Sequence, residues 1–202
     1  MHITIVILGI IVSSLISWFQ LKNKNVKGKD ICAILALQTI GLVAGSKLLD
    51  LIMNFDAHKN QDFITNINAG YMFYGGFLLA MLLVAIYTKR KKIENVNLIV
   101  FNNIVVLYAI WKIGCFVSGC CSGISNFPLQ ITETIVCFAI YVGLNLIKKN
   151  EYILTMFGIE RYLSIILRDR IDMDDLFVNI LISSCLIVIT LVINIRKKTL
   201  RV

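Results

Sequence analysis

Very little proline, histidine or charge is present in this chain. Among 202 residues there are one Pro and two His, and Asp, Glu, Lys and Arg together make up 16%. Proline interrupts helices because it lacks a backbone donor and its ring clashes with the preceding turn, so its scarcity allows long helices. So few charged residues cannot cover a soluble domain of this length, particularly when 58% of the residues are hydrophobic. A soluble globular protein is therefore excluded.

Long apolar runs take up most of the chain, whose mean hydropathy is +0.81. A helix needs about 20 mainly apolar residues to cross a bilayer, and a backbone in lipid must satisfy its own hydrogen bonds. We therefore predict an all-α, polytopic membrane protein with seven transmembrane helices, at residues 3–21, 31–55, 70–88, 96–119, 129–147, 152–167 and 176–195. The sixth run is the weakest because Glu160 and Arg161 fall within it. The first run has no basic segment before it and no cleavage pattern after it, which predicts a retained helix. Residues 1–202 are expected to form one bundle without a soluble domain.

The segments between the runs alternate in charge. Basic clusters follow the first, third, fifth and seventh runs, at residues 22–29, 89–92, 148–149 and 196–201. The segments after the second and fourth runs are poor in basic residues, and the segment after the sixth run is mixed. Since Lys and Arg accumulate in cytoplasmic loops, this pattern predicts an N-terminus outside the membrane and a C-terminus in the cytoplasm. The net charge of +8 comes from these clusters and not from a basic stripe along one face, so nucleic acid is not an expected partner.

Charged side chains inside the apolar runs are the first candidates for a functional site, because a charge in lipid is costly unless it faces a bundle interior or a wet cavity. Lys47 and Asp50 lie three residues apart on one helical face and could simply pair with each other. Arg161 and Arg168 are two turns apart on one face, although Arg168 could also reach the interface. Cations near one leaflet suit an anionic headgroup, and a guanidinium can bind phosphate through two hydrogen bonds. The full set is Lys47, Asp50, Lys112, Glu133, Glu160, Arg161 and Arg168.

Two glycine-rich segments adjoin further candidates. Glycine lets a ligand or a second helix approach closely, so the segment after Lys112 could serve a ligand or form a small-residue helix interface. The phenol of Tyr74, beside the other segment, could hydrogen-bond a ligand or transfer a proton. The glycines are Gly114, Gly119 and Gly123 after Lys112, and Gly75 and Gly76 after Tyr74.

Cys115, Cys120 and Cys121 form the one cluster among the six cysteines. Their spacing does not match a zinc site and no His is near, so no metal is expected. Three roles stay open. The thiols could pack as small apolar groups, could undergo redox or disulfide chemistry at the outer face, or could take part directly in a lipid-handling site.

Five segments resemble, in order, conserved segments of the bacterial prolipoprotein diacylglyceryl transferase family. They are Gly45-Ser46-Lys47-Leu48-Leu49, Phe73-Tyr74-Gly75-Gly76, Lys112 to Gly123, Pro128-Leu129-Gln130-Ile131-Thr132-Glu133, and Gly158-Ile159-Glu160-Arg161 with Arg168. The resemblance implies a seven-helix enzyme of the bacterial cytoplasmic (inner) membrane. Such an enzyme transfers diacylglyceryl from phosphatidylglycerol to a thiol acceptor, such as the lipobox cysteine of a preprolipoprotein, and it needs no metal or organic cofactor.

Several positions depart from the pattern of that family. Tyr74 stands where the family has His, Lys112 where it has Arg, Cys115 where it has Asn, and Cys120 where it has Glu. The extracytoplasmic head insertion of the family is reduced here to a short loop at residues 124–127. The resemblance therefore implies the fold, and it leaves the acceptor open.

The resemblance also implies roles for individual residues. Arg161 and Lys112 would hold the lipid phosphate, assisted by Arg168 and Lys47, and Tyr74 would act as a base beside the catalytic Arg161. The glycines named above would make room, while Gln130 and Glu133 would orient the polar groups of the pocket. Two other functions stay open: a non-catalytic or re-purposed lipid-binding or transport protein, and a membrane thiol or redox protein that uses Cys115, Cys120 and Cys121.

Overall fold

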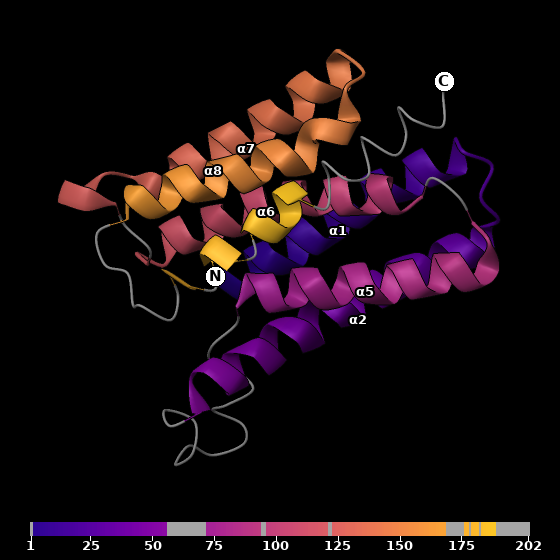
Figure 1. Cartoon of the computed structure of the whole chain (residues 1–202), viewed down its shortest axis with the longest axis horizontal. Coiled ribbons are helices and arrows are strands. Elements are labelled where there is room, and N and C mark those ends of the chain that lie inside the picture. Colours follow the sequence, from indigo (N-terminus) through magenta and orange to yellow (C-terminus); the bar gives the residue numbers. More distant parts are fainter. Residues whose placement is uncertain are drawn as a thin grey trace. The chain divides into compact units, whose positions relative to one another are not determined.

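The computed structural model describes residues 2–55, 72–93, 96–120, 123–168, 176–177, 179–181 and 183–188. Its regular elements are helices, as Figure 1 shows. The chain divides into two compact units. Residues 14–100 form the first, called the 14–100 unit, and residues 1–13 together with 101–202 form the second, called the 101–202 unit. The elements are α1 (His2–Lys22), α2 (Gly28–Met53), α5 (Phe73–Lys91), α6 (Asn97–Val117), η1 (Ile124–Asn126), α7 (Leu129–Leu146), η2 (Asn150–Tyr152) and α8 (Ile153–Ile166).

Within the described residues, five helices are long and apolar enough to cross a membrane: Thr4–Lys22 of α1, then α2, α5, α6 and α7. The all-helical, membrane-type architecture predicted from the sequence is thereby confirmed. The sixth predicted run is helical as α8, but with 14 residues it is shorter than the roughly 20 that span a bilayer. The seventh run is helical at residues 176–177, 179–181 and 183–188, and its remainder lies outside the described residues. Seven spans, the orientation of the termini and a single bundle stay predictions.

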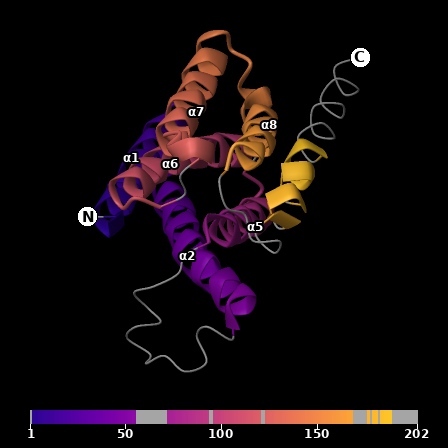
Figure 2. The same cartoon turned by 90° about the vertical axis from the view of Figure 1, so that its left-hand side faces the viewer.

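In the 14–100 unit, α2 and α5 form an antiparallel pair whose contact is made by glycine. A Cβ added at Gly75 would collide with the backbone carbonyl of Gly45, and one added at Gly76 would collide with the carbonyl of Leu42. Figures 1 and 2 show the two helices side by side. At the other end of the pair, the Tyr87 hydroxyl donates to Asp30 at 2.8 Å. Small residues at such a contact let two backbones approach closely, which is the main source of attraction between helices in lipid.

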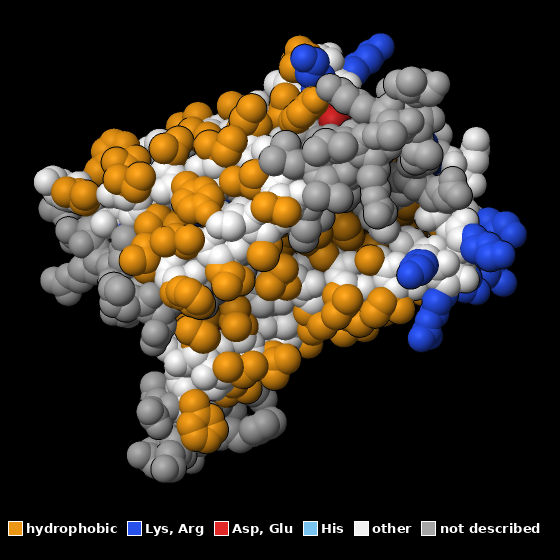
Figure 3. Space-filling model, viewed as in Figure 1, with side chains coloured by type: hydrophobic (Ala, Val, Ile, Leu, Met, Phe, Trp, Pro, Cys, Tyr) orange, Lys and Arg blue, Asp and Glu red, His pale blue; other side chains and the backbone are white. Residues whose placement is uncertain are grey.

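Apolar side chains lie along the outward surfaces of these helices, and basic side chains lie at their ends (Figure 3). Ile40 and Ile52 on α2 and Leu82 on α5 are more than half exposed. The antiparallel pairing brings the basic start of α2 and the basic end of α5, which includes Lys89–Lys91, to the same end of the pair. Exposed apolar flanks with charge confined to helix ends are the surface that a bilayer requires.

In the 101–202 unit, α6 is the central helix, since every residue from Phe101 to Ile110 is buried. The Ser13 hydroxyl of α1 donates to the Asn103 carbonyl at 2.9 Å, and the Tyr141 hydroxyl of α7 donates to Asn103 Oδ1 at 2.6 Å. Figures 1 and 2 show α7 and α8 side by side. These contacts place a polar face of α6 against its neighbours and not against lipid.

α6 ends at a glycine in the left-handed conformation. Gly119 has a φ of +67°, the Gly119 amide donates to the Phe116 carbonyl at 3.0 Å, and the Cys120 amide donates to the Cys115 carbonyl at 3.1 Å. This pair of bonds is the Schellman arrangement, which satisfies carbonyls that the helix leaves open at its C-terminus. Gly119 therefore terminates the helix, because other residues strain at this φ.

Further contacts bring the end of α6, the start of α7 and the end of α8 together. The Ile124 amide donates to the Leu167 carbonyl at 3.0 Å, and a Cβ at Gly123 would lie 2.9 Å from that carbonyl oxygen. The Gln130 amide donates to the Cys120 carbonyl. We call this end of the 101–202 unit the loop end.

The glycine contact between α2 and α5 can be tested with a pair of matched substitutions. Gly75→Ala forces the Gly45 backbone to move and is expected to lower the free energy of unfolding by about 1–3 kcal/mol. Gly143→Ala in α7, where a Cβ meets nothing within 4 Å, removes a flexible residue and is expected to raise it by about 0.5–1 kcal/mol. The measurement is reversible unfolding in detergent followed by tryptophan fluorescence. Equal effects of the two changes would contradict the close approach.

The orientation predicted from charge can be tested by cysteine labelling in spheroplasts. In a background without the six native cysteines, Phe127→Cys at the loop end is expected to react with an impermeant maleimide. Lys149→Cys, beyond the other end of α7, is expected to react only after the membrane is permeabilised. Labelling of Lys149→Cys in intact spheroplasts would show that the positive-inside pattern has been misread.

Candidate functional site

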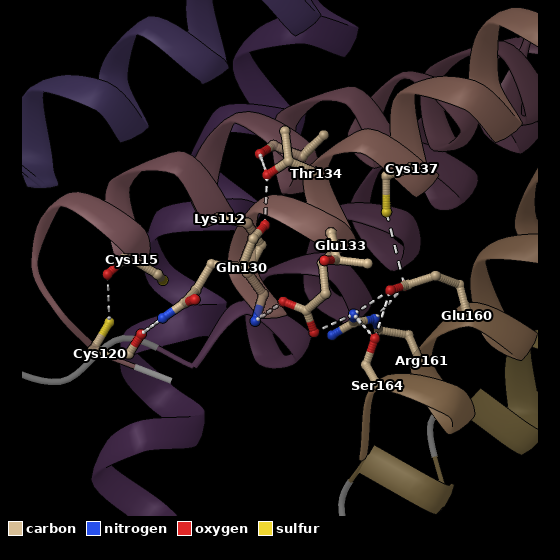
Figure 4. A network of polar contacts seen from close by, with 12 residues as sticks. Lys112, Cys115, Cys120, Gln130, Glu133, Thr134, Cys137, Glu160, Arg161 and Ser164 are labelled. Carbon is tan, nitrogen blue, oxygen red and sulfur yellow. Dashed lines mark hydrogen bonds and ion pairs between the residues drawn. The ribbon is translucent and has the colours of Figure 1, made fainter. Parts of the chain in front are cut away.

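Four ionisable side chains from three helices meet inside the 101–202 unit (Figure 4). They are Lys112 of α6, Glu133 of α7, and Glu160 and Arg161 of α8, with exposed fractions of 5%, 2%, 6% and 3%. Lys112 precedes the last residue of α6 by five positions, and Glu133 follows the first residue of α7 by four. At 1.5 Å per residue the cluster therefore lies about 6–8 Å inside the loop end.

Glu133 joins the two cations of this cluster. Its Oε2 lies 2.7 Å from the Lys112 ammonium, and its Oε1 accepts a hydrogen bond of 2.6 Å from Arg161 Nη2. The two cations thus approach the two oxygens of one carboxylate from different helices. An anion with two accessible oxygens is what this pair of groups can bind.

A second carboxylate, Glu160, holds Arg161 from the same helix. Arg161 Nε donates to Glu160 Oε2 at 2.7 Å, and Arg161 Nη2 donates to Glu160 Oε1 at 2.7 Å. The Ser164 hydroxyl donates to Glu160 Oε1 at 2.6 Å, and the Cys137 thiol lies 3.8 Å from Glu160 Oε2. The guanidinium is therefore fixed in orientation by groups on α7 and α8.

Two aromatic rings, those of Tyr108 and Phe157, lie next to the charges on the side away from the loop end. The Arg161 Cζ is 4.4 Å and the Lys112 ammonium 5.3 Å from the centre of the Tyr108 ring. The two rings meet edge to face with their centres 5.1 Å apart. Each aromatic residue precedes one of the cations by four positions, hence by one helical turn. The Tyr108 ring attracts both cations through its π face, and the Phe157 ring, 5.9 Å from the Arg161 Cζ, attracts Arg161.

The family assignment rests on the length of chain that its model covers. The sequence model of the prolipoprotein diacylglyceryl transferase family matches residues 2–196. The chain belongs to this family.

The chain is also similar to a curated phosphatidylglycerol–prolipoprotein diacylglyceryl transferase from Clostridium tetani. The two are 24% identical over 136 residues, which are 65% of this chain and 55% of the relative. The chain thus spans little more than half the length of the relative that it matches. No solved structure matches the chain.

The remaining predicted residues of the 101–202 unit lie between the cluster and the loop end or at the loop end itself. Gln130 is one turn from Glu133 and bonds to the end of α6, and Gly114 is buried within α6. Gly123 forms a bridge with the half-buried Arg168. Gly119 and Gly123 are thus explained by backbone geometry, and their service to a ligand stays a prediction.

The cysteines at the loop end fall on the same helix terminus. Cys115 is buried, Cys120 is exposed, and the Cys120 thiol lies 3.4 Å from the Cys115 carbonyl. The Schellman arrangement joins these two positions through the backbone, and the three roles left open for the thiols stay predictions. Cys121 lies outside the described residues.

The other predicted residues belong to the 14–100 unit. Lys47 lies 3.4 Å from Asp50, the local pairing that their spacing allowed, and Asp50 also accepts from Asn54 at 2.9 Å. Tyr74 is half-buried in the first turn of α5, with its ring edge to face with Phe73 at 6.1 Å. Gly75 and Gly76 lie in the α2–α5 contact. Their roles toward a lipid stay predictions.

Glu160 was a candidate because of its charge inside an apolar run. Sequence reasoning gave no role to four other members of the cluster: Tyr108, Cys137, Phe157 and Ser164. Three of them had a usable signal. An aromatic residue one turn before a cation recurs on α6 and α8, and Glu160 and Ser164 are spaced for contact on one face of α8. Cys137 had no such signal, because a thiol in an apolar run resembles any small core residue.

Removal of Arg161 should be strongly destabilising in this family member. Arg161→Ala leaves Glu133 and Glu160 as neighbouring buried carboxylates and is expected to lower the free energy of unfolding by about 3–5 kcal/mol. Arg90→Ala, at the exposed end of α5, is expected to change it by less than about 0.5 kcal/mol. Both are measured by thermal unfolding in detergent. Similar stability of the two variants would argue against the ion cluster.

Proposed function

We propose that this chain binds phosphatidylglycerol, with the lipid phosphate at Lys112 and Arg161, and transfers the diacylglyceryl group to a thiol acceptor. The observation that carries the proposal is the convergence of these two buried cations, from separate helices, on the two oxygens of one anionic group. Membership of the diacylglyceryl transferase family supports the lipid donor and the reaction type. The named activity of the C. tetani relative makes a cysteine thiol of a prolipoprotein the leading acceptor.

The position of the two cations suits a lipid headgroup. They lie about 6–8 Å from the ends of the helices at the loop end, toward the middle of these helices. A phosphate at that depth leaves the acyl chains of the same lipid along the apolar flanks, where Leu163 on α8 and Ile135 on α7 are more than half exposed. The cations can therefore hold the headgroup while the chains stay in the bilayer.

The reaction requires a nucleophile, a base and a stabilised leaving group. The acceptor sulfur forms a bond to the glyceryl carbon next to the phosphate, and the carbon–oxygen bond breaks, so that glycerol phosphate leaves with the electron pair. The thiol proton passes to a base, for which the phenolate form of Tyr74 is the candidate from the family resemblance. Lys112 and Arg161 stabilise the charge on the departing phosphate, because fixed donors in a site without water act more strongly than in solution.

Transfer can be tested with purified protein in phosphatidylglycerol liposomes and a lipobox peptide. Glycerol phosphate release is expected from the wild type and not with phosphatidylcholine. Lys112→Met should lower the rate by on the order of 100-fold, since it removes one of two donors to the leaving group. Lys149→Met, at an exposed position beyond α7, should leave the rate unchanged.

Two outcomes would count against this function. Equal release by wild type and Lys112→Met would remove the phosphate site from the reaction. Binding of phosphatidylglycerol without any release would favour the non-catalytic alternative.

A further inference from the structure

Among the described residues, the four charges of the buried cluster cancel. Lys112 and Arg161 contribute two positive charges, and Glu133 and Glu160 contribute two negative charges. None of the four side chains is more than 6% exposed. Charges buried in this way are stable only while they stay matched, because an unpaired charge away from water costs several kcal/mol.

A bound phosphodiester would upset this balance. It carries one negative charge, and the two cations that would receive it are already in contact with the carboxylate of Glu133. The lipid phosphate and the Glu133 carboxylate therefore compete for the same two groups. Both cannot hold them as anions without leaving one negative charge unmatched.

We propose that the Glu133 carboxylate occupies the place of the lipid phosphate before the lipid binds. Binding of the phosphate then displaces Glu133, which takes up one proton. This inference rests on the proposed function. The proton makes Glu133 neutral, so the cluster keeps zero net charge once the phosphate has arrived. The neutral carboxyl can then donate a hydrogen bond to a phosphate oxygen.

The phosphate is expected to displace Glu133 and not Glu160, because fewer groups hold Glu133. Within the described residues its oxygens contact only Lys112 and Arg161. Glu160 accepts two hydrogen bonds from Arg161 and one from Ser164, and all three residues lie on α8. Release of Glu133 leaves Arg161 oriented, whereas release of Glu160 would not.

The other titratable groups that face the cluster cannot take up this proton. On α6 they are Lys112 and Tyr108, and on α7 Cys137. On α8 Arg161 is always charged. A protonated ammonium, phenol or thiol has no capacity for a further proton at neutral pH. Within the described residues, Glu133 and Glu160 are the groups that can accept it.

Displacement also helps the product to leave. When the glyceryl carbon–oxygen bond breaks, glycerol phosphate remains on the two cations with the electron pair of that bond. Glu133 gives its proton to the phosphate, which is now a monoester dianion, and returns to Lys112 and Arg161 as the phosphate departs. The Glu133 carboxylate competes with the lipid phosphate for the two cations, and it competes with glycerol phosphate in the same way. It therefore limits inhibition by this product.

The test is isothermal titration of short-chain phosphatidylglycerol into the whole protein in detergent, in two buffers of different ionisation enthalpy. The difference in heat is expected to show uptake of about one proton per lipid, and affinity is expected to fall as pH rises, by up to about tenfold per pH unit. Glu133→Gln cannot be protonated and should bind the lipid more tightly, without uptake and without this pH dependence. Glu151→Gln, at η2 and outside the cluster, should behave as the wild type.

Each outcome decides between the two proposals. Binding to the wild type without proton uptake overturns the displacement and leaves the proposed function standing, and this measurement does not depend on whether Glu133→Gln folds. Uptake that persists in Glu133→Gln would assign the proton to Glu160 and overturn the role of Glu133. Absence of lipid binding at every pH would reject both proposals. Free glycerol phosphate should bind more weakly than the lipid, and tighter binding would mean that the site serves a soluble phosphate.

Discussion

The ion pairs between Glu133 and its two cations decide how three helices of this protein face one another. In a bilayer, apolar side chains gain little by leaving lipid for a neighbouring helix, so hydrogen bonds and close packing must set the arrangement. Lys112, Glu133 and Arg161 each turn toward a common point because none of them can face acyl chains without a large penalty. The rotation of α6, α7 and α8 about their own axes follows from that requirement.

The remaining features of the 101–202 unit keep this point near one end of the helices. α8 has only 14 residues, about 21 Å of helix, and Arg161 lies near its end. The loop end is tied by the Gly119 turn, by the contact of Gly123 with Leu167, and by the bond from Gln130 to Cys120. The charged groups can therefore be buried and still lie close to a membrane surface, where a lipid headgroup resides.

The sequence indicated the helices and the polar residues within them, but not how those residues combine. Apolar runs are local properties of the chain, and five of them became helices long enough to span a membrane. The Lys47–Asp50 ion pair could also be predicted from the sequence, since the two residues are spaced to lie on one helical face. The Lys112–Glu133 contact joins two helices, and nothing in the local pattern specifies it. Glycine was ambiguous for a similar reason, because Gly75 serves helix packing, Gly119 ends a helix and Gly143 faces open space.

The pair of Tyr108 and Phe157 has a consequence for the membrane itself. α6 has amide side chains at Asn102 and Asn103 and an ammonium at Lys112, so polar groups occur along much of its length. A chain of such groups through a bilayer would invite water and conduct protons, dissipating the gradient that the cell maintains. The two rings meet edge to face between these positions on α6 and α8, and interrupt the chain with apolar carbon. Aromatic carbon therefore lies between the amide side chains of α6 and its buried ammonium.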